Sequence, residues 1–143
     1  MDEMDPAAIF LPMCVLVAWT FAVLLLVPIA RFRAAAKGRV NAGDFRFGES
    51  VRVPGEVSLP NRNLMNLLEL PVLFYVVCIA LYITLSVDAL AVALAWLYVV
   101  LRIAHSLVHL TYNNVFHRLG VYAASSVVLL ALWVRFAAAL LQR

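Results

Sequence analysis

Ionisable and amide side chains interrupt three apolar stretches of the sequence at helical spacing. Arg62, Asn66 and Glu69 are separated by four and then three residues, which places them on one face of a helix. The same spacing recurs further along, at Arg102, His105, Ser106 and His109. Arg118 and Tyr122 lie four residues apart on a third segment. A pocket lined by such groups beside lipid suits an anionic, water-soluble cofactor that meets an apolar substrate from the bilayer.

The elements that must position these groups are membrane-spanning helices. Of the 143 residues, 66% are hydrophobic and 13% are charged, whereas soluble domains are about half apolar and a quarter charged. A bilayer core about 30 Å thick needs roughly 20 apolar residues per helix. The sequence therefore predicts one all-α domain over residues 1–143, an integral membrane four-helix bundle. Its spans are expected at about 7–30, 63–86, 89–110 and 119–141.

The polar stretch between the first two spans, residues 31–62, contains seven basic and three acidic residues. Lys and Arg in short loops favour the cytoplasmic side of a membrane. We therefore expect this loop to be cytoplasmic and both termini to be non-cytoplasmic, in the inner membrane if the protein is bacterial. The same topology accounts for the net charge of +3 without a nucleic-acid partner.

An ionisable group inside a span costs about 3 kcal/mol on insertion scales, so each such group needs an explanation. Glu69 and Arg102 lie roughly 10 and 12 Å from the cytoplasmic ends of their helices, at 1.5 Å per residue. Because the two depths match, we expect these side chains to form an ion pair. Arg135, in the outer half of the fourth span, is expected to extend outward to the headgroups.

Several of these residues also have a purely structural interpretation. Arg62 could anchor a helix end at the membrane surface, and Arg118 could simply determine topology. His105 and His109 have the spacing of two metal ligands on a helix. No third ligand is evident in the sequence, so we expect the histidines to form hydrogen bonds and expect no metal.

The segment from Arg62 to Pro71 (RNLMNLLELP), the segment 102–109 (RIAHSLVH), and then Arg118 and Tyr122 together resemble the MAPEG family. These are the membrane-associated proteins of eicosanoid and glutathione metabolism. The likeness is closest to the branch of microsomal glutathione transferase and prostaglandin E synthase, with its bacterial relatives. It covers essentially the whole chain and implies a homotrimer with glutathione bound between neighbouring subunits.

The resemblance also implies roles for single residues. Arg118 would be the catalytic residue, because a cationic neighbour lowers the pKa of a thiol and so favours the nucleophilic thiolate. The residues expected to hold glutathione or contact the second substrate are Arg31, Arg62, Asn66, Glu69, Arg102, His105, His109 and Tyr122. His109 stands where this branch usually has tyrosine, and Leu119 stands where the prostaglandin synthase has serine. These departures weaken the case for prostaglandin synthesis in particular.

The leading hypothesis is a glutathione-dependent transferase or peroxidase that acts on lipophilic electrophiles or lipid hydroperoxides among the membrane lipids. The alternative is a non-catalytic membrane protein of the same family that binds lipid or serves as a scaffold. A proton or ion carrier is less favoured, because the outer half of the spans offers no continuous polar path.

Overall fold

The computed structural model describes residues 5–142; residues 1–4 and 143, which the predicted domain also includes, lie outside the described residues. The described chain is helical and contains no β-sheet. Its elements in order are η1 Pro6–Ile9, α1 Phe10–Ala36, η2 Ala42–Phe45, α2 Gly55–Leu68, α3 Leu70–Ile83, α4 Ala89–Leu110 and α5 Val115–Leu141.

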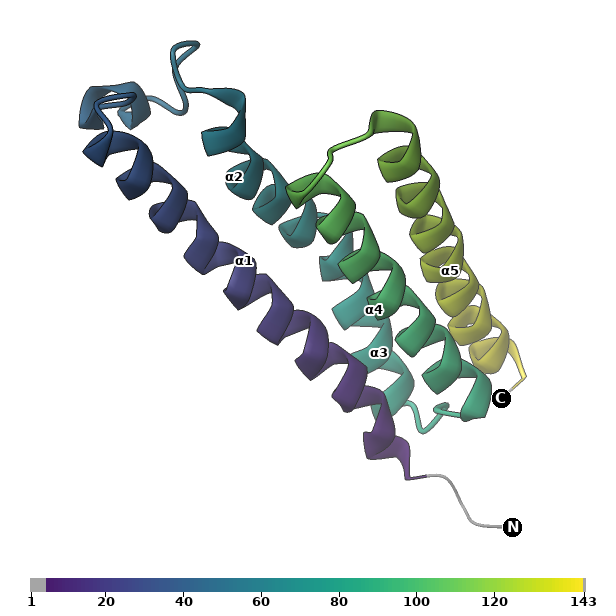
Figure 1. The fold of residues 1–143 in the computed structure, drawn as a ribbon. Coiled ribbons are helices and arrows are strands. Elements are labelled where there is room, and N and C mark those ends of the chain that lie inside the picture. The colour runs from purple at the N-terminus through teal and green to yellow at the C-terminus, as the bar shows by residue number, and fades with distance from the viewer. Residues whose placement is uncertain (1–4, 143) are drawn as a thin grey trace.

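Four helical runs are long and apolar enough to cross a bilayer. They are Pro6–Ala36, Gly55–Ile83, Ala89–Leu110 and Val115–Leu141. Figure 1 shows these runs as a bundle in which the start of α1 and the end of α5 lie at the same end. The predicted all-α membrane bundle, and with it an integral multi-pass protein, is confirmed. Two further points stay predictions. One is the side of the membrane on which the termini lie, and the other is the assembly as a homotrimer.

Three of the four spans extend beyond their predicted bounds at the end of the bundle that carries the polar residues, whereas α4 has the predicted bounds. Helix α1 continues to Ala36 and α2 begins at Gly55, so the connector between them is 37–54 rather than the predicted 31–62. Helix α5 also begins one turn earlier than predicted, because the Asn114 side chain caps its first amides at 3.0 and 3.1 Å. Hydropathy marks where a helix enters lipid, whereas caps and turns decide where it ends.

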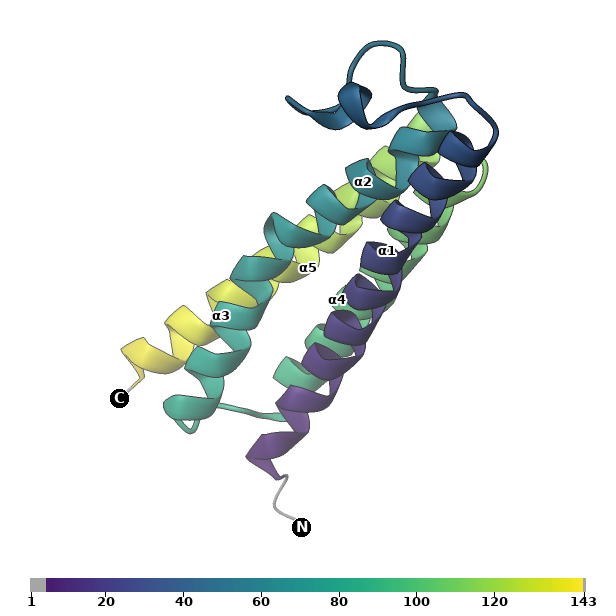
Figure 2. The same cartoon turned by 90° about the vertical axis from the view of Figure 1, so that its left-hand side faces the viewer.

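The second span, predicted as residues 63–86, is divided into two helices at Glu69. That residue has φ −88° and ψ −96°, outside the helical region. Two residues later, Pro71 lacks the amide hydrogen that would bond back into the preceding turn. Figure 2 shows α2 and α3 following one another along the same line, so the break changes local backbone direction without ending the span.

Apolar side chains from all four spans form the core of the bundle. Phe74 of α3 and Tyr98 of α4 stack with ring centroids 4.6 Å apart. Leu16 of α1 and Leu132 of α5 are fully buried in the same cluster. Large apolar residues also cover the outward faces of the helices, as expected of a bundle surrounded by lipid.

At the end of the bundle where α1 starts, Arg135 contacts the turn between α3 and α4. Its Nε and Nη2 atoms donate to Asp88 Oδ2 at 3.1 and 2.5 Å. The extension of Arg135 to the headgroups stays a prediction, and this ion pair with Asp88 is a contact that the sequence did not predict. Asp88 also caps α4 by accepting from the Ala91 amide at 2.8 Å. Partial burial opposes ionisation of Asp88, but the Ala91 amide and the Arg135 guanidinium together hold the pKa of its carboxyl below the ordinary value.

We expect Arg135→Met to lower the free energy of unfolding in detergent by about 1 kcal/mol at neutral pH, the scale of a partly exposed ion pair. A carboxyl with a depressed folded-state pKa contributes stability above its unfolded pKa and loses that contribution as pH falls through the folded pKa. The difference between the wild type and Arg135→Met should therefore shrink as pH falls below the ordinary aspartate pKa, and it should disappear only below the depressed pKa of Asp88 in the folded protein. Circular dichroism melts across this pH range would measure it, and a difference that persists in acid would contradict the assignment.

Candidate functional site

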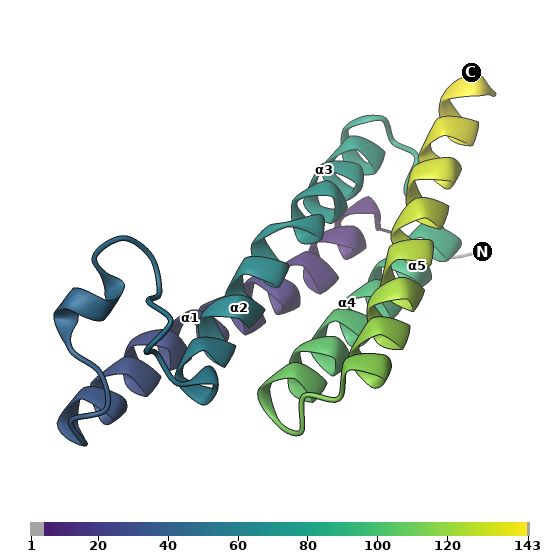
Figure 3. The ribbon, with the colours of Figure 1, turned by 90° about the horizontal axis from the view of Figure 1, so that it is seen from above.

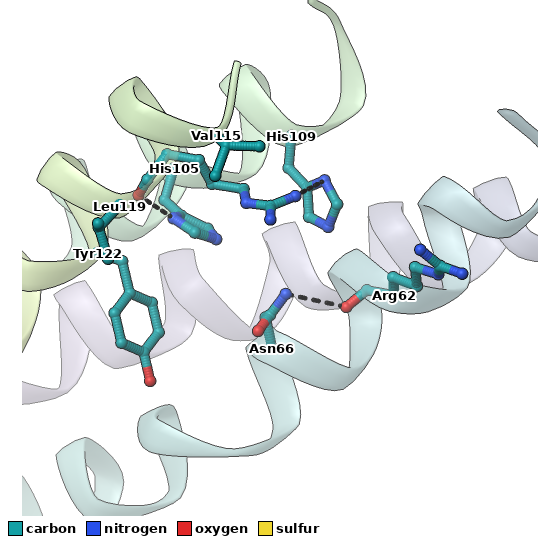
Figure 4. Close-up of a pocket in the computed structure, with 8 residues that line it drawn as sticks. Arg62, Asn66, His105, His109, Val115, Leu119 and Tyr122 are labelled. Atoms are coloured by element: carbon teal, nitrogen blue, oxygen red, sulfur yellow. Dashed lines mark hydrogen bonds between the residues drawn. The ribbon is translucent and has the colours of Figure 1, made fainter. Parts of the chain in front are cut away.

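Six of the predicted site residues line one pocket at the connector end of the bundle, between α2, α4 and α5. The pocket has a volume of about 330 Å³, at the lower end of the range for ligand sites. Its lining residues are Arg62, Asn66, His105, His109, Val115, Arg118, Leu119 and Tyr122. Figure 4 shows the labelled side chains coming from separate helices. The lining includes two guanidinium groups and no carboxylate, so the pocket favours an anion.

His105 of α4 has a defined tautomer. Its Nδ1 atom lies 3.1 Å from the backbone carbonyl oxygen of Arg118, and a carbonyl oxygen only accepts hydrogen bonds. Nδ1 therefore carries the proton, and Nε2 of the neutral ring holds a lone pair. Nε2 is buried and has no hydrogen-bond partner among residues 5–142. It can accept a hydrogen bond from an N–H or S–H group of a ligand.

Asn113, just after the end of α4, holds Arg118 in place. Asn113 has a left-handed backbone conformation, with φ +46°, which asparagine tolerates better than most residues. Its Oδ1 atom accepts from Arg118 Nη1 at 2.8 Å and lies 3.0 Å from His109 Nδ1. His109 Nδ1 also lies 3.3 Å from Arg118 Nη1. A protonated Nδ1 donates to Asn113 Oδ1, whereas an unprotonated Nδ1 accepts from Arg118. Asn113 is not among the predicted site residues, although an asparagine pair in a short connector is a recognisable turn signal.

The ring of Tyr122 contacts two other polar groups of the site. Its centroid lies 5.6 Å from that of His105, and the Arg102 guanidinium carbon lies 5.4 Å from the Tyr122 centroid. The predicted shared face of Arg118 and Tyr122 on α5 thus points toward α4. These contacts orient the phenol ring at the wall of the pocket.

Arg102 is fully buried in α4 and does not line the pocket. Its Nη2 atom donates to the backbone carbonyl of Asn66, in the last turn of α2, where carbonyl groups lack helical partners. A cation at a helix C-terminus is also favoured by the helix dipole. Arg102 therefore stabilises the end of α2 and so fixes the backbone that carries Asn66 into the pocket.

The expected ion pair between Glu69 and Arg102 is not formed in the part of the chain that the structure describes. The described ion pairs, with N–O distances up to 4.0 Å, join other residues, and Glu69 is exposed. The break explains the difference, because Glu69 itself has left the helical conformation on which the predicted shared face depends. Glu69 lies outside the pocket lining, so its role in binding stays a prediction.

Arg31 also lies apart from the pocket. It forms an ion pair with Glu49 at 3.1 Å, and its guanidinium group lies 4.5 Å from the centroid of the Phe45 ring. It lines a second, mostly apolar cavity of about 430 Å³ together with Pro28 and Phe32. A single chain therefore does not bring Arg31 together with Arg118.

A buried hydrogen-bond cluster lies beside the site and was missed by the sequence analysis. Ser106 Oγ accepts from Asn63 Nδ2 at 2.5 Å and from Trp19 Nε1 at 2.9 Å. These bonds join α4, α2 and α1. The sequence shows Ser106 on the polar face of its helix, but it does not show which helices face it.

The comparisons with known proteins agree with this architecture. A model of the MAPEG family matches residues 9–138, nearly the whole chain. Searches of curated proteins and of solved structures found no match.

We expect Ser106→Ala to lower the free energy of unfolding by about 2–4 kcal/mol, because it leaves a buried donor on Asn63 and a partly buried donor on Trp19 without an acceptor. Ser126→Ala is the matched control. The Ser126 hydroxyl bonds only to the Tyr122 carbonyl of its own helix, at 2.9 Å, so its removal should cost under about 0.5 kcal/mol. Unfolding of both variants in the same detergent would compare them. Equal effects would show that the cluster does not hold the three helices together.

Proposed function

The chain belongs to the MAPEG family, and on that premise we propose that it is a membrane-bound glutathione-dependent transferase or peroxidase. Its substrates would be lipophilic electrophiles or lipid hydroperoxides that reach the site from the bilayer. The family includes glutathione transferases, peroxidases and eicosanoid synthases, and also some non-catalytic members.

The observation that carries this proposal is the cationic pocket built around Arg118. Glutathione has two carboxylates, one ammonium group and a thiol, so it is a net anion that matches a lining with guanidinium groups and no carboxylate. The Nη1 atom of the Arg118 guanidinium group donates a hydrogen bond to Asn113 Oδ1. The other two nitrogens make no described hydrogen bond, so they are available to a ligand.

In this proposal Arg118 stabilises the glutathione thiolate by charge and hydrogen bonding. A nearby cation raises the thiolate fraction at neutral pH, and the thiolate is the nucleophile. In the transferase reaction the thiol first loses its proton to solvent, and the thiolate sulfur then forms a bond to an electrophilic carbon of the substrate. The electron pair of the bond that breaks at that carbon leaves with the leaving group, or passes to the neighbouring atom of an epoxide or activated double bond, which then takes up a proton from solvent. The neutral His105 ring supports binding, because its unpartnered Nε2 atom accepts a hydrogen bond from the tripeptide.

We further infer a homotrimer whose neighbouring subunits complete the site. Arg62 and Glu69 are exposed on the surface of the second span, although charged groups facing lipid cost a few kcal/mol. A second copy of the chain that packs over this surface would shield both residues. It would also allow Arg31 of one subunit and Arg118 of another to contact the same glutathione.

We expect purified protein titrated with glutathione to develop the ultraviolet absorbance of a bound thiolate. Arg118→Ala should abolish that absorbance and lower the transferase rate at least about a hundredfold, the usual effect of removing one charge-stabilising group from an active site. Arg33→Ala is the matched control. Arg33 is exposed near the same end of the bundle, at the end of α1, and makes no described ion pair.

Calorimetry of the same titration separates the alternatives. Glutathione binding without thiolate formation in the wild type would favour the non-catalytic membrane lipid-binding or scaffold protein of the family. An absence of binding would overturn the proposal. An equal loss of thiolate in Arg33→Ala would show that general surface charge, rather than Arg118, is responsible.

A further inference from the structure

The connector between α1 and α2 is an ordered turn built around Asp44. The Asp44 carboxylate accepts from the Asn41 amide at 2.9 Å and from Ser50 Oγ at 3.0 Å. These two bonds, the Asn41 amide first, hold the pKa of the Asp44 carboxyl below its ordinary value. The Ser50 amide closes the turn by donating to the Asp44 carbonyl at 2.8 Å. Glu49 fastens the turn to α1 through its ion pair with Arg31.

This ordered turn presents four exposed side chains, which we name the connector tip: Arg46, Phe47, Val51 and Arg52. Phe47 is 92% exposed and Val51 is fully exposed. The Arg46 guanidinium carbon lies 5.1 Å from the centroid of the Phe47 ring. Transfer of large apolar side chains out of water lowers the free energy. The connector tip is therefore suited to a partner surface that is partly apolar.

The charges of the connector tip show what kind of partner fits. Each acidic residue of the segment 31–62 already has a partner: Asp44 bonds within the turn, Glu49 pairs with Arg31, and Glu56 pairs with Arg39. Arg46 and Arg52 form no ion pair with any described residue. The connector tip is therefore cationic as well as apolar.

The connector tip lies beside the bundle, at the level of the membrane surface. The first helical run, Pro6–Ala36, has 31 residues and is about 46 Å long at 1.5 Å per residue. A bilayer is about 40–45 Å thick with its headgroups, so the end of α1 lies at headgroup level. Figures 1 and 3 show η2 at that end, on the side of the bundle away from α5.

We propose that the connector tip binds anionic phospholipid in the leaflet on its own side of the membrane. Arg46 and Arg52 contact headgroup phosphates, while Phe47 and Val51 insert beneath the headgroups. Basic residues near an anionic membrane surface and aromatic residues at the interface are both favourable. A free anion would match the two arginines but would leave Phe47 and Val51 in water.

Native mass spectrometry of the full chain in detergent, titrated with phosphatidylglycerol or phosphatidylcholine, tests the charge requirement. We expect tighter binding of phosphatidylglycerol, and Arg46→Gln should weaken it about fivefold, equivalent to ~1 kcal/mol per basic residue. Arg39→Gln is the matched control, since it removes the same charge from the same segment but from a residue already paired with Glu56. Equal affinity for the two lipids, or equal loss in both variants, would overturn the proposal.

A photo-crosslinking amino acid at position 47 tests insertion directly. In membranes that contain phosphatidylglycerol, we expect adducts with the mass of one phospholipid. A crosslink to a second copy of the chain would show that Phe47 packs at a subunit interface and would overturn the proposal. Because Phe47 makes no buried contact, this substitution should leave the melting temperature in detergent unchanged, and a melt of the labelled protein checks that it is folded.

Discussion

The arrangement of this bundle depends on how a buried guanidinium group finds an acceptor. Arg102 is fully buried, and its Nε and Nη1 atoms have no hydrogen-bond partner among residues 5–142. A buried cation with no partner at all would be costly. The acceptor of Arg102 is a backbone carbonyl, that of Asn66, which lies at the end of α2 because the second span breaks at Glu69. The break and the arginine therefore stabilise one another. Without the break, that carbonyl would belong to an unbroken helix and Arg102 would need a carboxylate partner.

The side chains of the pocket are likewise oriented by hydrogen bonds to backbone and amide oxygens. His105 bonds to the carbonyl of Arg118, and Arg118 itself bonds to the side chain of Asn113. Acceptors of this kind orient a cation without neutralising it, whereas a carboxylate would cancel the charge that an anionic ligand needs. The bundle thus holds its site residues rigidly while the pocket keeps a positive potential.

Sequence patterns predicted those features that depend on local chemistry. Apolar stretches of bilayer length predict the four spans. Helical spacing predicts that His105 and His109 lie on one face of their helix and that Arg118 and Tyr122 lie on one face of the next. The Glu69–Arg102 pair could not be predicted correctly, since depth along an assumed straight helix ignores the break near Pro71. Asn113 and Ser106 were missed as organising residues because their importance comes from contacts between elements distant in sequence, which periodicity does not encode.

The distribution of acidic residues explains why the pocket stays cationic. Glu49 in the connector and Glu56 in the first turn of α2 each bind an arginine away from the pocket, and Asp44 bonds within its own turn. Asp88 pairs with Arg135 at the opposite end of the bundle. Within the spans that the structure describes, Glu69 is the acidic residue without such a partner, and it lies outside the pocket lining. The partnered carboxylates of this chain thus lie in the connectors and at a helix end, and the two arginines that line the pocket retain their charge for a ligand.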